Sequence, residues 1–193
     1  MASILLYDAS SLGTYLSRTA SDPRPVVMMT CGVTGSGKTT LSKWIMKSYP
    51  GFRRLSTDMY IYVNHGHYDV DYPKTMYNEY QVAAERAMRT ELAESLQAGK
   101  DLILDFTFAF QETRDEWKAL IESYGGRWVL VALDVDTVEV KQRVRARNAL
   151  PLRRKDGDST FFVNEALLDS FIAGFEWPSG EGEIVMRLDG FVG

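Results

Sequence analysis

The sequence has little of several features that mark whole classes of proteins. Its one cysteine, Cys31, excludes an intrachain disulfide, and the apolar run before it favours a packed, reduced thiol. No apolar stretch approaches the length that spans a bilayer. The N-terminus lacks the basic start and the long apolar region of a secretory signal. We therefore expect a cytoplasmic protein that does not enter a membrane.

The chain also lacks an excess of basic residues. Its 22 Lys and Arg against 26 Asp and Glu give a formal net charge of -4. Dedicated nucleic-acid binders usually carry a basic footprint, so the composition disfavours that class, although a local basic groove stays compatible with it. No repeat or linker divides the sequence, and 193 residues suit a single domain spanning residues 1–193.

Continuous apolar runs alternate with helical patterns along the chain. Five runs predict strands, at residues 25–31, 52–56, 101–105, 128–133 and 182–188. Helices are expected between and after them, at residues 38–48, 75–98, 111–124, 137–148 and 164–174. Residues 1–24 read as a lead-in with a short helix, and residues 58–75 as the most irregular part. Continuously apolar strands predict an α/β fold: a doubly wound, parallel five-stranded sheet with helices on both faces.

A glycine-rich loop joins the first predicted strand to the first helix. It fits the pattern G-x-x-x-x-G-K-[ST] at every fixed position. Its glycines let several N–H groups point into one concavity, and the helix N-terminus adds partial positive charge. Lys38 is expected to reach the β- and γ-phosphates of a nucleotide, and the Thr39 hydroxyl to bind Mg²⁺. The predicted nucleotide contacts are Gly32, Thr34, Gly35, Ser36, Gly37, Lys38, Thr39 and Thr40.

Two aspartates follow predicted strands, where ligands bind in such sheets. Asp58 ends the second strand beside the expected γ-phosphate, so its carboxylate could accept the proton of an attacking hydroxyl. Asp105 ends the third strand, and we expect it to hold Mg²⁺ or to contact the substrate. Because aspartate is also a common helix N-cap, a capping role stays open for both residues.

A strongly basic helix is predicted after the fourth strand. Arg143 and Arg147 share one face of it, and further basic residues follow in the adjoining loop. Arginines stabilise the charge that builds up during phosphoryl transfer, and a basic lid over about residues 143–163 would also exclude water. We predict a catalytic role for Arg147 first and Arg143 second. The alternative is an ordinary solvated basic face.

Aromatic rings crowd the segment after Asp58. His65 and His67 have no obvious third ligand, so ring packing is favoured over a metal site. The tyrosines, among them Tyr62, lie where an acceptor substrate would enter, and an aromatic lining suits a sugar, a ring or a base. Ordinary core packing explains these tyrosines equally well.

Taken in order, these motifs resemble the kinase family that includes polynucleotide 5′-hydroxyl kinases, zeta-toxin-type kinases and related small-molecule phosphotransferases. The resemblance covers about residues 26–177 and rests on residues 32–40, 49–52 with 56–58, 105–107 with Arg114, and 133–135 with Arg143 and Arg147. It implies a P-loop NTPase fold, ATP and Mg²⁺ as cofactors, and Asp58 as the base. It also implies that Arg114 lies near the acceptor.

The stretch after Asp58 departs from that family. Polynucleotide kinases have Asp-x-x-Arg there, whereas this chain has Asp58, Met59, Tyr60 and Ile61. The leading hypothesis is therefore an ATP- and Mg²⁺-dependent kinase acting on a hydroxyl of a small-molecule acceptor that carries no phosphate. A polynucleotide 5′-hydroxyl kinase is the alternative enzyme, which keeps nucleic acid as a less favoured partner. A nucleotide-binding regulator with little turnover is the alternative from another class.

Overall fold

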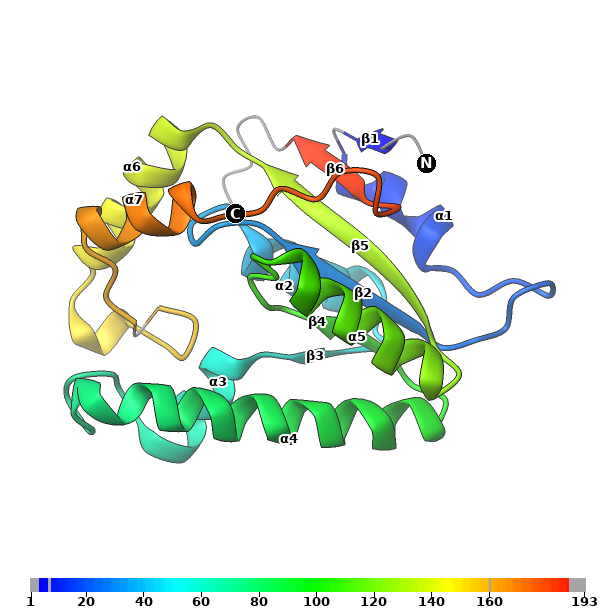
Figure 1. Cartoon of the computed structure of the whole chain (residues 1–193), viewed down its shortest axis with the longest axis horizontal. Coiled ribbons are helices and arrows are strands. Elements are labelled where there is room, and N and C mark those ends of the chain that lie inside the picture. Colours follow the sequence, from blue (N-terminus) through cyan, green and yellow to red (C-terminus); the bar gives the residue numbers. More distant parts are fainter. Residues whose placement is uncertain (1–3, 7, 160, 188–193) are drawn as a thin grey trace.

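All strands of the structure join one parallel sheet. The computed structural model describes residues 4–6, 8–159 and 161–187 (Figure 1). Its six strands lie in the order β1-β6-β5-β2-β4-β3. They are β1 (Ile4–Leu6), β2 (Val26–Cys31), β3 (Phe52–Leu55), β4 (Asp101–Leu104), β5 (Arg127–Asp134) and β6 (Ile184–Arg187). The predicted α/β fold and its five strands are confirmed, and β1 adds an edge strand beside β6 that the sequence did not indicate.

Helices connect the strands in the alternation that parallel pairing requires. The α-helices are α1 (Gly13–Leu16), α2 (Lys38–Ser48), α3 (Thr57–His65), α4 (Tyr77–Gln97), α5 (Gln111–Ser123), α6 (Thr137–Asn148) and α7 (Glu165–Ala173). Short 3₁₀ turns are η1 (Ala9–Leu12), η2 (Lys74–Met76) and η3 (Leu152–Arg154). Among the described residues, no helix is both long and apolar enough to cross a bilayer.

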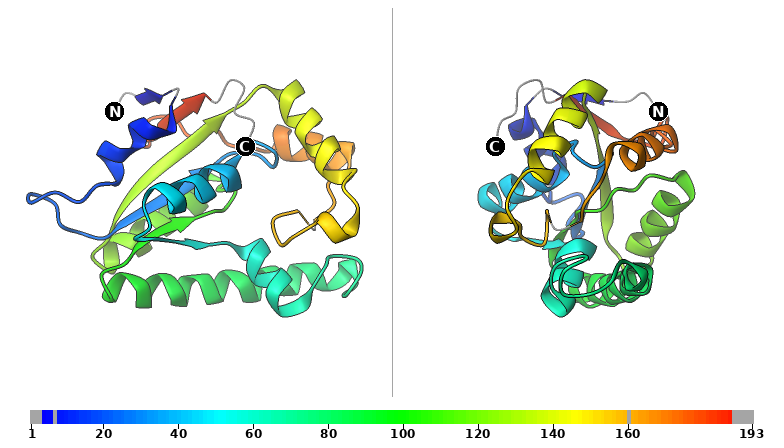
Figure 2. Two further views of the ribbon diagram at one scale, coloured as in Figure 1. Left: turned by 180° about the vertical axis from the view of Figure 1, so that it is seen from behind. Right: turned by 90° about the vertical axis from the view of Figure 1, so that its left-hand side faces the viewer.

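The central strand β2 is buried on both of its faces. Val26 and Met28 pack with α1 and α2, whereas Val27 and Met29 pack with α4 and α5 on the opposite side. Figures 1 and 2 show these two helical layers on either side of the sheet. Successive side chains of a strand point to opposite faces, so an uninterrupted apolar run is what a covered sheet needs. Each such side chain stabilises the fold by about 1.5–3 kcal/mol.

Helix α3 (Thr57–His65) corrects the prediction that residues 58–75 are the most irregular part of the chain. Ser56 caps its first turn by accepting a hydrogen bond from the backbone N–H of Met59 at 3.3 Å. Gly66 ends it with a φ of 83°, a conformation that favours glycine. Ile61 is its one buried residue, so the segment carries almost no apolar periodicity that could have predicted a helix.

Helices α6 and α7 form a small unit beside the carboxyl ends of the strands (Figure 2). A separate apolar cluster of Val140, Val144, Val163 and Leu168 joins them. Residues 149–163 run between these two helices, and α3 follows the carboxyl end of β3 at the same side of the sheet. The loop after β2, the ends of β3 and β4, and α6 therefore surround one space.

Candidate active site

The glycine loop between β2 and α2 adopts a conformation that depends on its glycines. Gly35 and Gly37 have φ values of 85° and 99°, which side chains rarely allow. A Cβ atom on Gly35 would also lie 2.8 Å from Cγ2 of Val144, so the loop passes close to α6. Gly32 and Ser36 are buried beneath the loop, whereas the other six predicted nucleotide contacts line the cleft above it.

Lys38 is folded back onto the loop. Its Nζ donates hydrogen bonds to the carbonyl oxygens of Gly32 and Val33, each at 2.9 Å. Burial lowers the pKa of this amine, while the nearby carboxylates of Asp105 and Asp58 oppose that effect. The Lys38 ammonium group therefore lies at the loop and is bound only by neutral carbonyl oxygens. An anionic phosphate could displace these oxygens from it.

A cleft of about 1080 Å³ opens over the loop. Its charged side chains come from five segments: the loop and α2, the start of α3, the end of β4, α6, and the connection from α6 to α7. They are Lys38, Asp58, Asp105, Glu139, Arg143, Arg147 and Asp158. The predicted base, the predicted metal ligand and both predicted arginines therefore share one cleft with the glycine loop.

Asp58 faces this cleft from the first turn of α3. Ser56 is the N-cap of that helix, so the alternative that Asp58 serves as its cap is wrong. The Asp58 side chain is exposed to the cleft. Partial desolvation by the cleft walls raises the pKa of its carboxyl, and the neighbouring Asp105 raises it further. Lys38 and Arg147 lower it and so favour the ionised form. Asp58 is thus a carboxylate with a raised affinity for a proton. The two nearby cations, Lys38 and Arg147, could both bind a phosphate group.

Asp105 is buried at the end of β4 and is paired with Arg54 of β3. The Nε atom of Arg54 donates to Oδ2 of Asp105 at 2.7 Å. In the described part of the chain, Oδ1 of Asp105 accepts no hydrogen bond. One carboxylate oxygen therefore stays available to a ligand, while the other fixes the side chain.

Asp158 reaches the same guanidinium from the connection between α6 and α7. It accepts hydrogen bonds from both terminal nitrogens of Arg54, at 3.3 Å from NH1, and pairs with Nζ of Lys43 at 2.8 Å. Burial alone would raise the pKa of Asp158, but the hydrogen bonds from Arg54 and Lys43 outweigh it and lower that pKa. This contact pins residues 149–163 to β3 and α2.

The two predicted arginines of α6 lie against the glycine loop. Arg147 donates to Oγ1 of Thr34 at 3.2 Å, and Arg143 lies 3.5 Å from the carbonyl oxygens of Gly35 and Ser36. Burial lowers the pKa of Arg147, and Asp58 opposes that shift. These two side chains therefore do not belong to an ordinary solvated face, in contrast to Arg145, which is 63% exposed and pairs with Glu165.

The structure does not support two predicted acceptor contacts. Arg114 is 1% exposed and lies outside the cleft lining. It donates to Glu181 and to the carbonyl oxygens of Phe108 and Glu176, which ties α5 to the segment before β6. Tyr62 also lies outside the lining, because it packs beneath Gly157 of the α6–α7 connection.

The histidines pack against aromatic rings, as predicted. His65 stacks on Tyr80 with ring centroids 3.6 Å apart, and His67 meets the edge of Tyr62 at 5.0 Å. Among the described residues, no group of three or more His, Cys, Asp or Glu side chains is placed to hold a metal ion by itself. Of the tyrosines in this region, Tyr77 does line the cleft, while Tyr72 is buried in the neighbouring apolar cluster.

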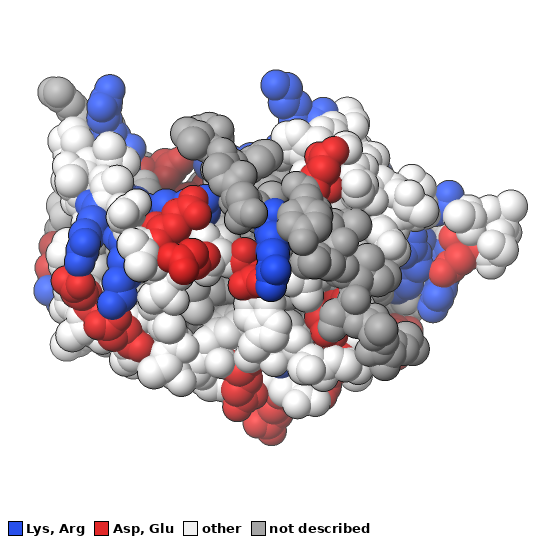
Figure 3. All heavy atoms as spheres, turned by 90° about the horizontal axis from the view of Figure 1, so that it is seen from above, with Lys and Arg blue, Asp and Glu red and all other residues white. Residues whose placement is uncertain are grey.

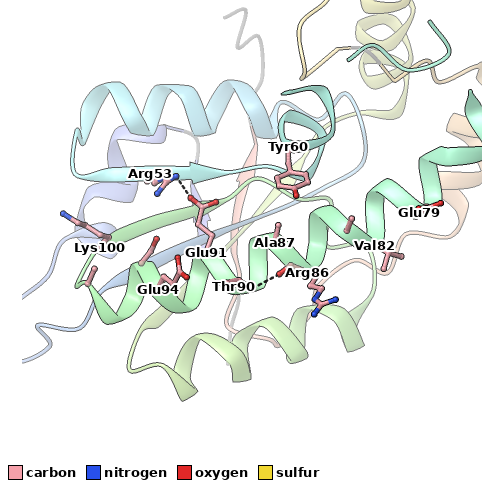
Figure 4. A pocket seen from close by; sticks show the side chains of 13 residues that line it. Arg53, Tyr60, Glu79, Val82, Arg86, Ala87, Thr90, Glu91, Glu94 and Lys100 are labelled. Carbon is pink, nitrogen blue, oxygen red and sulfur yellow. Dashed lines mark hydrogen bonds and ion pairs between the residues drawn. The ribbon is translucent and has the colours of Figure 1, made fainter. Parts of the chain in front are cut away.

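Sequence reasoning missed Arg54 and Asp158. The signal for Arg54 was present, because Arg53 and Arg54 occupy consecutive positions of a strand and must point to opposite faces. Arg53 reaches Glu91 on α4, beside a second groove of about 990 Å³ along that helix (Figure 4). That groove contains none of the predicted site residues, so the cleft over the loop is the candidate site.

Comparisons with known proteins agree with this fold. The profile of the AAA_33 family, an AAA domain, matches residues 27–178. No curated protein is recognisably similar to the chain in sequence. A provisionally assigned kinase from Chloroflexus aurantiacus has a TM-score of 0.66 at 18% identity, covering 86% of this chain and 85% of its own. A gluconokinase from Sinorhizobium meliloti 1021 has a TM-score of 0.53 at 19% identity, covering 86% and 83%.

A chain of the Pnkp1/Rnl/Hen1 RNA repair complex is also similar in structure, with a TM-score of 0.64 at 15% identity. The match covers 78% of this chain but only 44% of the repair-complex chain, so the present chain spans less than half the length of that protein. Identities this low show a shared fold, and the activity has to be argued from the site itself.

Proposed function

We propose, since this chain belongs to the AAA_33 family of P-loop kinase domains, that it transfers the γ-phosphate of ATP to a hydroxyl group of a small molecule. One observation carries this proposal: the Asp58 carboxylate lines the same cleft as the glycine loop, Lys38 and Arg147. That is the arrangement that an in-line attack on a γ-phosphate needs. ATP is the expected donor because most kinases that the sequence resembles use it.

In the proposed transfer, four charged side chains of the cleft have a role. The acceptor oxygen forms a bond to the γ-phosphorus, the bond to the β,γ-bridging oxygen breaks, and ADP leaves. Asp58 takes the hydroxyl proton of the acceptor. Lys38, released from its two loop carbonyls, would contact the β- and γ-phosphates, and Arg147 and Arg143 would stabilise the charge of the transferring group.

Thr39 and Asp105 fit a magnesium ion. Both line the cleft, both offer the oxygen ligands that Mg²⁺ prefers, and Asp105 keeps Oδ1 outside its contact with Arg54. Magnesium, when bound there with the nucleotide, would neutralise phosphate charge. Arg54 would hold the Asp105 carboxylate in place throughout, as a positioning residue.

Residues 143–163 would act as the lid of this site. Arg143 and Arg147 meet the loop, and Asp158 fastens the far end of the segment to Arg54 and Lys43. A lid held at both ends excludes water from the phosphates and brings the arginines to bear on them.

The distribution of basic residues in the cleft and on the surface favours a small-molecule acceptor over a polynucleotide. The cleft basic residues Lys38, Arg143 and Arg147 are all needed for the triphosphate of the donor. On the face seen in Figure 3, the basic and acidic side chains of the described residues lie interspersed. The similar fold of a gluconokinase is consistent with a small acceptor.

The test is transfer from ATP labelled at its γ-phosphate to pooled sugars, nucleosides, aminoglycosides and a 5′-hydroxyl oligonucleotide. Wild type should label one pool in a Mg²⁺-dependent manner, and Lys38→Ala should label none. Labelling of the oligonucleotide in preference to all pools would favour the polynucleotide kinase. Tight ATP binding with no labelled product from any pool would favour the regulator.

A further inference from the structure

The lining of the cleft divides into a charged part and an uncharged part. Seven charged side chains line it together with the glycine loop. The remaining wall comes from the start of α4, the segment after Asp105, the end of the α6–α7 connection, and α7. We call it the aromatic mouth, and it consists of Tyr77, Asn78, Gln81, Phe106, Thr107, Ala109, Phe110, Phe161, Val163, Leu167, Ser170, Phe171, Gly174 and Phe175. No residue of the mouth carries a charge.

Much of the mouth comes from α7 and from the segment that leads into α5. In Figures 1 and 2, α5 and α7 lie on one side of the sheet and α2 on the other. We propose that the aromatic mouth binds the acceptor, and that the acceptor is an uncharged alcohol with a flat ring. This inference rests on the proposed kinase function.

Exposed phenyl rings mark the mouth as a binding surface. Phe110 is 54% exposed and Phe171 is 40% exposed, while most large apolar side chains of the described chain are buried. Phe106 and Phe175 stand half-buried behind them and belong to the core beneath the mouth. A ligand ring lying against Phe110 and Phe171 would gain both burial and stacking.

The backbone around these rings is held rigidly. The N–H of Glu176 donates to the carbonyl of Ala109 at 2.9 Å, and the Glu176 carboxylate accepts from the N–H of Gln111 at 2.8 Å. Arg114 bridges the carbonyls of Phe108 and Glu176, each at 2.9 Å. Arg114 therefore positions the mouth from behind, which is a different role from the direct acceptor contact expected from the sequence.

Phe108 adds an unusual backbone conformation at this point. Its φ is 46°, in the left-handed region that a bulky residue rarely adopts. Hydrogen bonds from Cys31 and Arg114 to its carbonyl hold it there. Such strained residues concentrate where a chain shapes a binding site, and this one sets the direction of the segment that carries Phe110.

The carboxamide groups of the mouth can form hydrogen bonds with the polar edge of a ring and carry no charge of their own. Asn78 and Gln81 lie about one turn apart on α4, and their carboxamides offer both donors and acceptors. Gln81 donates to the hydroxyl of Tyr77 at 3.2 Å, which orients both side chains. An anionic acceptor, in contrast, would find no cation among the residues of the mouth.

Binding of defined probes tests this inference without requiring turnover. The donor site is first filled with a non-hydrolysable ATP analogue and Mg²⁺, and titration calorimetry then measures thymidine and uridine against gluconate and glycerate. The neutral nucleosides should bind and the two acids should not. Phe110→Ala and Phe171→Ala should each weaken thymidine on the order of tenfold and leave the ATP analogue unchanged. Phe162→Ala is the matched control, since Phe162 is 51% exposed but lies outside the lining.

Three results would overturn the inference: binding of the acids in preference to the nucleosides, no binding of either nucleoside at millimolar concentration, or loss of the ATP analogue in the two mouth variants. The last result would mean that the mouth holds the base of the donor. Nucleoside binding without any phosphoryl transfer would leave the mouth intact and contradict the proposed kinase activity, so the two failures are distinguishable.

Discussion

Asp158 and Arg54 form a buried ion pair between the α6–α7 connection and β3, with side chains 7% and 8% exposed. The pair fastens the lid to β3, and removing one partner leaves Arg54 with Asp105 alone. Asp158→Asn should therefore lower the free energy of unfolding by about 1–3 kcal/mol. Because Arg54 and Lys43 lower the pKa of Asp158, this stabilisation is present above the ordinary pKa of aspartate and is lost as the pH falls through the lowered value.

Thermal unfolding of both proteins between pH 3 and pH 7 measures this effect. Asp156→Asn serves as the control, because Asp156 is 56% exposed and its oxygen lies 3.7 Å from Lys43. Its effect should stay within about 0.5 kcal/mol. Equal effects of the two substitutions would mean that Asp158 does not fasten the lid.

Arg147 and Arg145 offer a matched pair on one helix. Arg147 lies against Thr34 of the loop, whereas Arg145 points to Glu165 in solvent. Arg147→Ala should reduce kcat on the order of 10²-fold or more, because a desolvated arginine acts on the charge of the transferring phosphate. Arg145→Ala should leave kcat within about twofold. Similar losses in both variants, measured by single-turnover transfer, would assign the effect to helix stability.

The raised pKa of Asp58 predicts two pH effects with defined signs. The base must be ionised, so the acidic limb of kcat/KM should lie above the ordinary aspartate pKa of about 4. The folded protein also binds this proton more tightly than the unfolded chain, so ionised Asp58 lowers stability at neutral pH. Asp58→Asn should consequently unfold at a higher temperature than wild type at pH 7. The difference should disappear at low pH, and a lower unfolding temperature at pH 7 would contradict this interpretation.

Substitution of Arg114 should lower the stability of the fold and leave the affinity for ATP unchanged. Its guanidinium is buried against Glu181, 67 residues away, so Arg114→Ala, which breaks this pair, should cost about 3–5 kcal/mol of stability. Glu181→Gln keeps the shape and one of the two oxygens that accept from Arg114, and should cost less. Denaturant unfolding compares the two variants, and equilibrium dialysis with labelled ATP should give wild-type affinity for the folded protein. Weaker ATP binding by a folded Arg114 variant would return Arg114 to the active site.

The strands and their functional ends follow from local patterns. Apolar runs, glycines and the residue after each strand placed Lys38, Asp58 and Asp105 at one edge of the sheet. The contacts that sequence reasoning missed are those whose partners lie far along the chain. Arg54 meets Asp158, which is 104 residues away, and Arg114 meets Glu181. No local periodicity reports such pairs, so Arg114 was assigned to the acceptor from a motif alone.

Phosphoryl transfer by wild type and by Asp58→Asn tests the central claim most directly. ATP labelled at its γ-phosphate and Mg²⁺ are supplied with the pooled hydroxyl compounds, and ATP binding is measured in parallel. The account predicts a labelled acceptor with wild type, a loss of about 10²–10⁴-fold in the variant, and nearly unchanged ATP binding by both. A variant that transfers phosphate at the wild-type rate would contradict the assignment of Asp58 as the base.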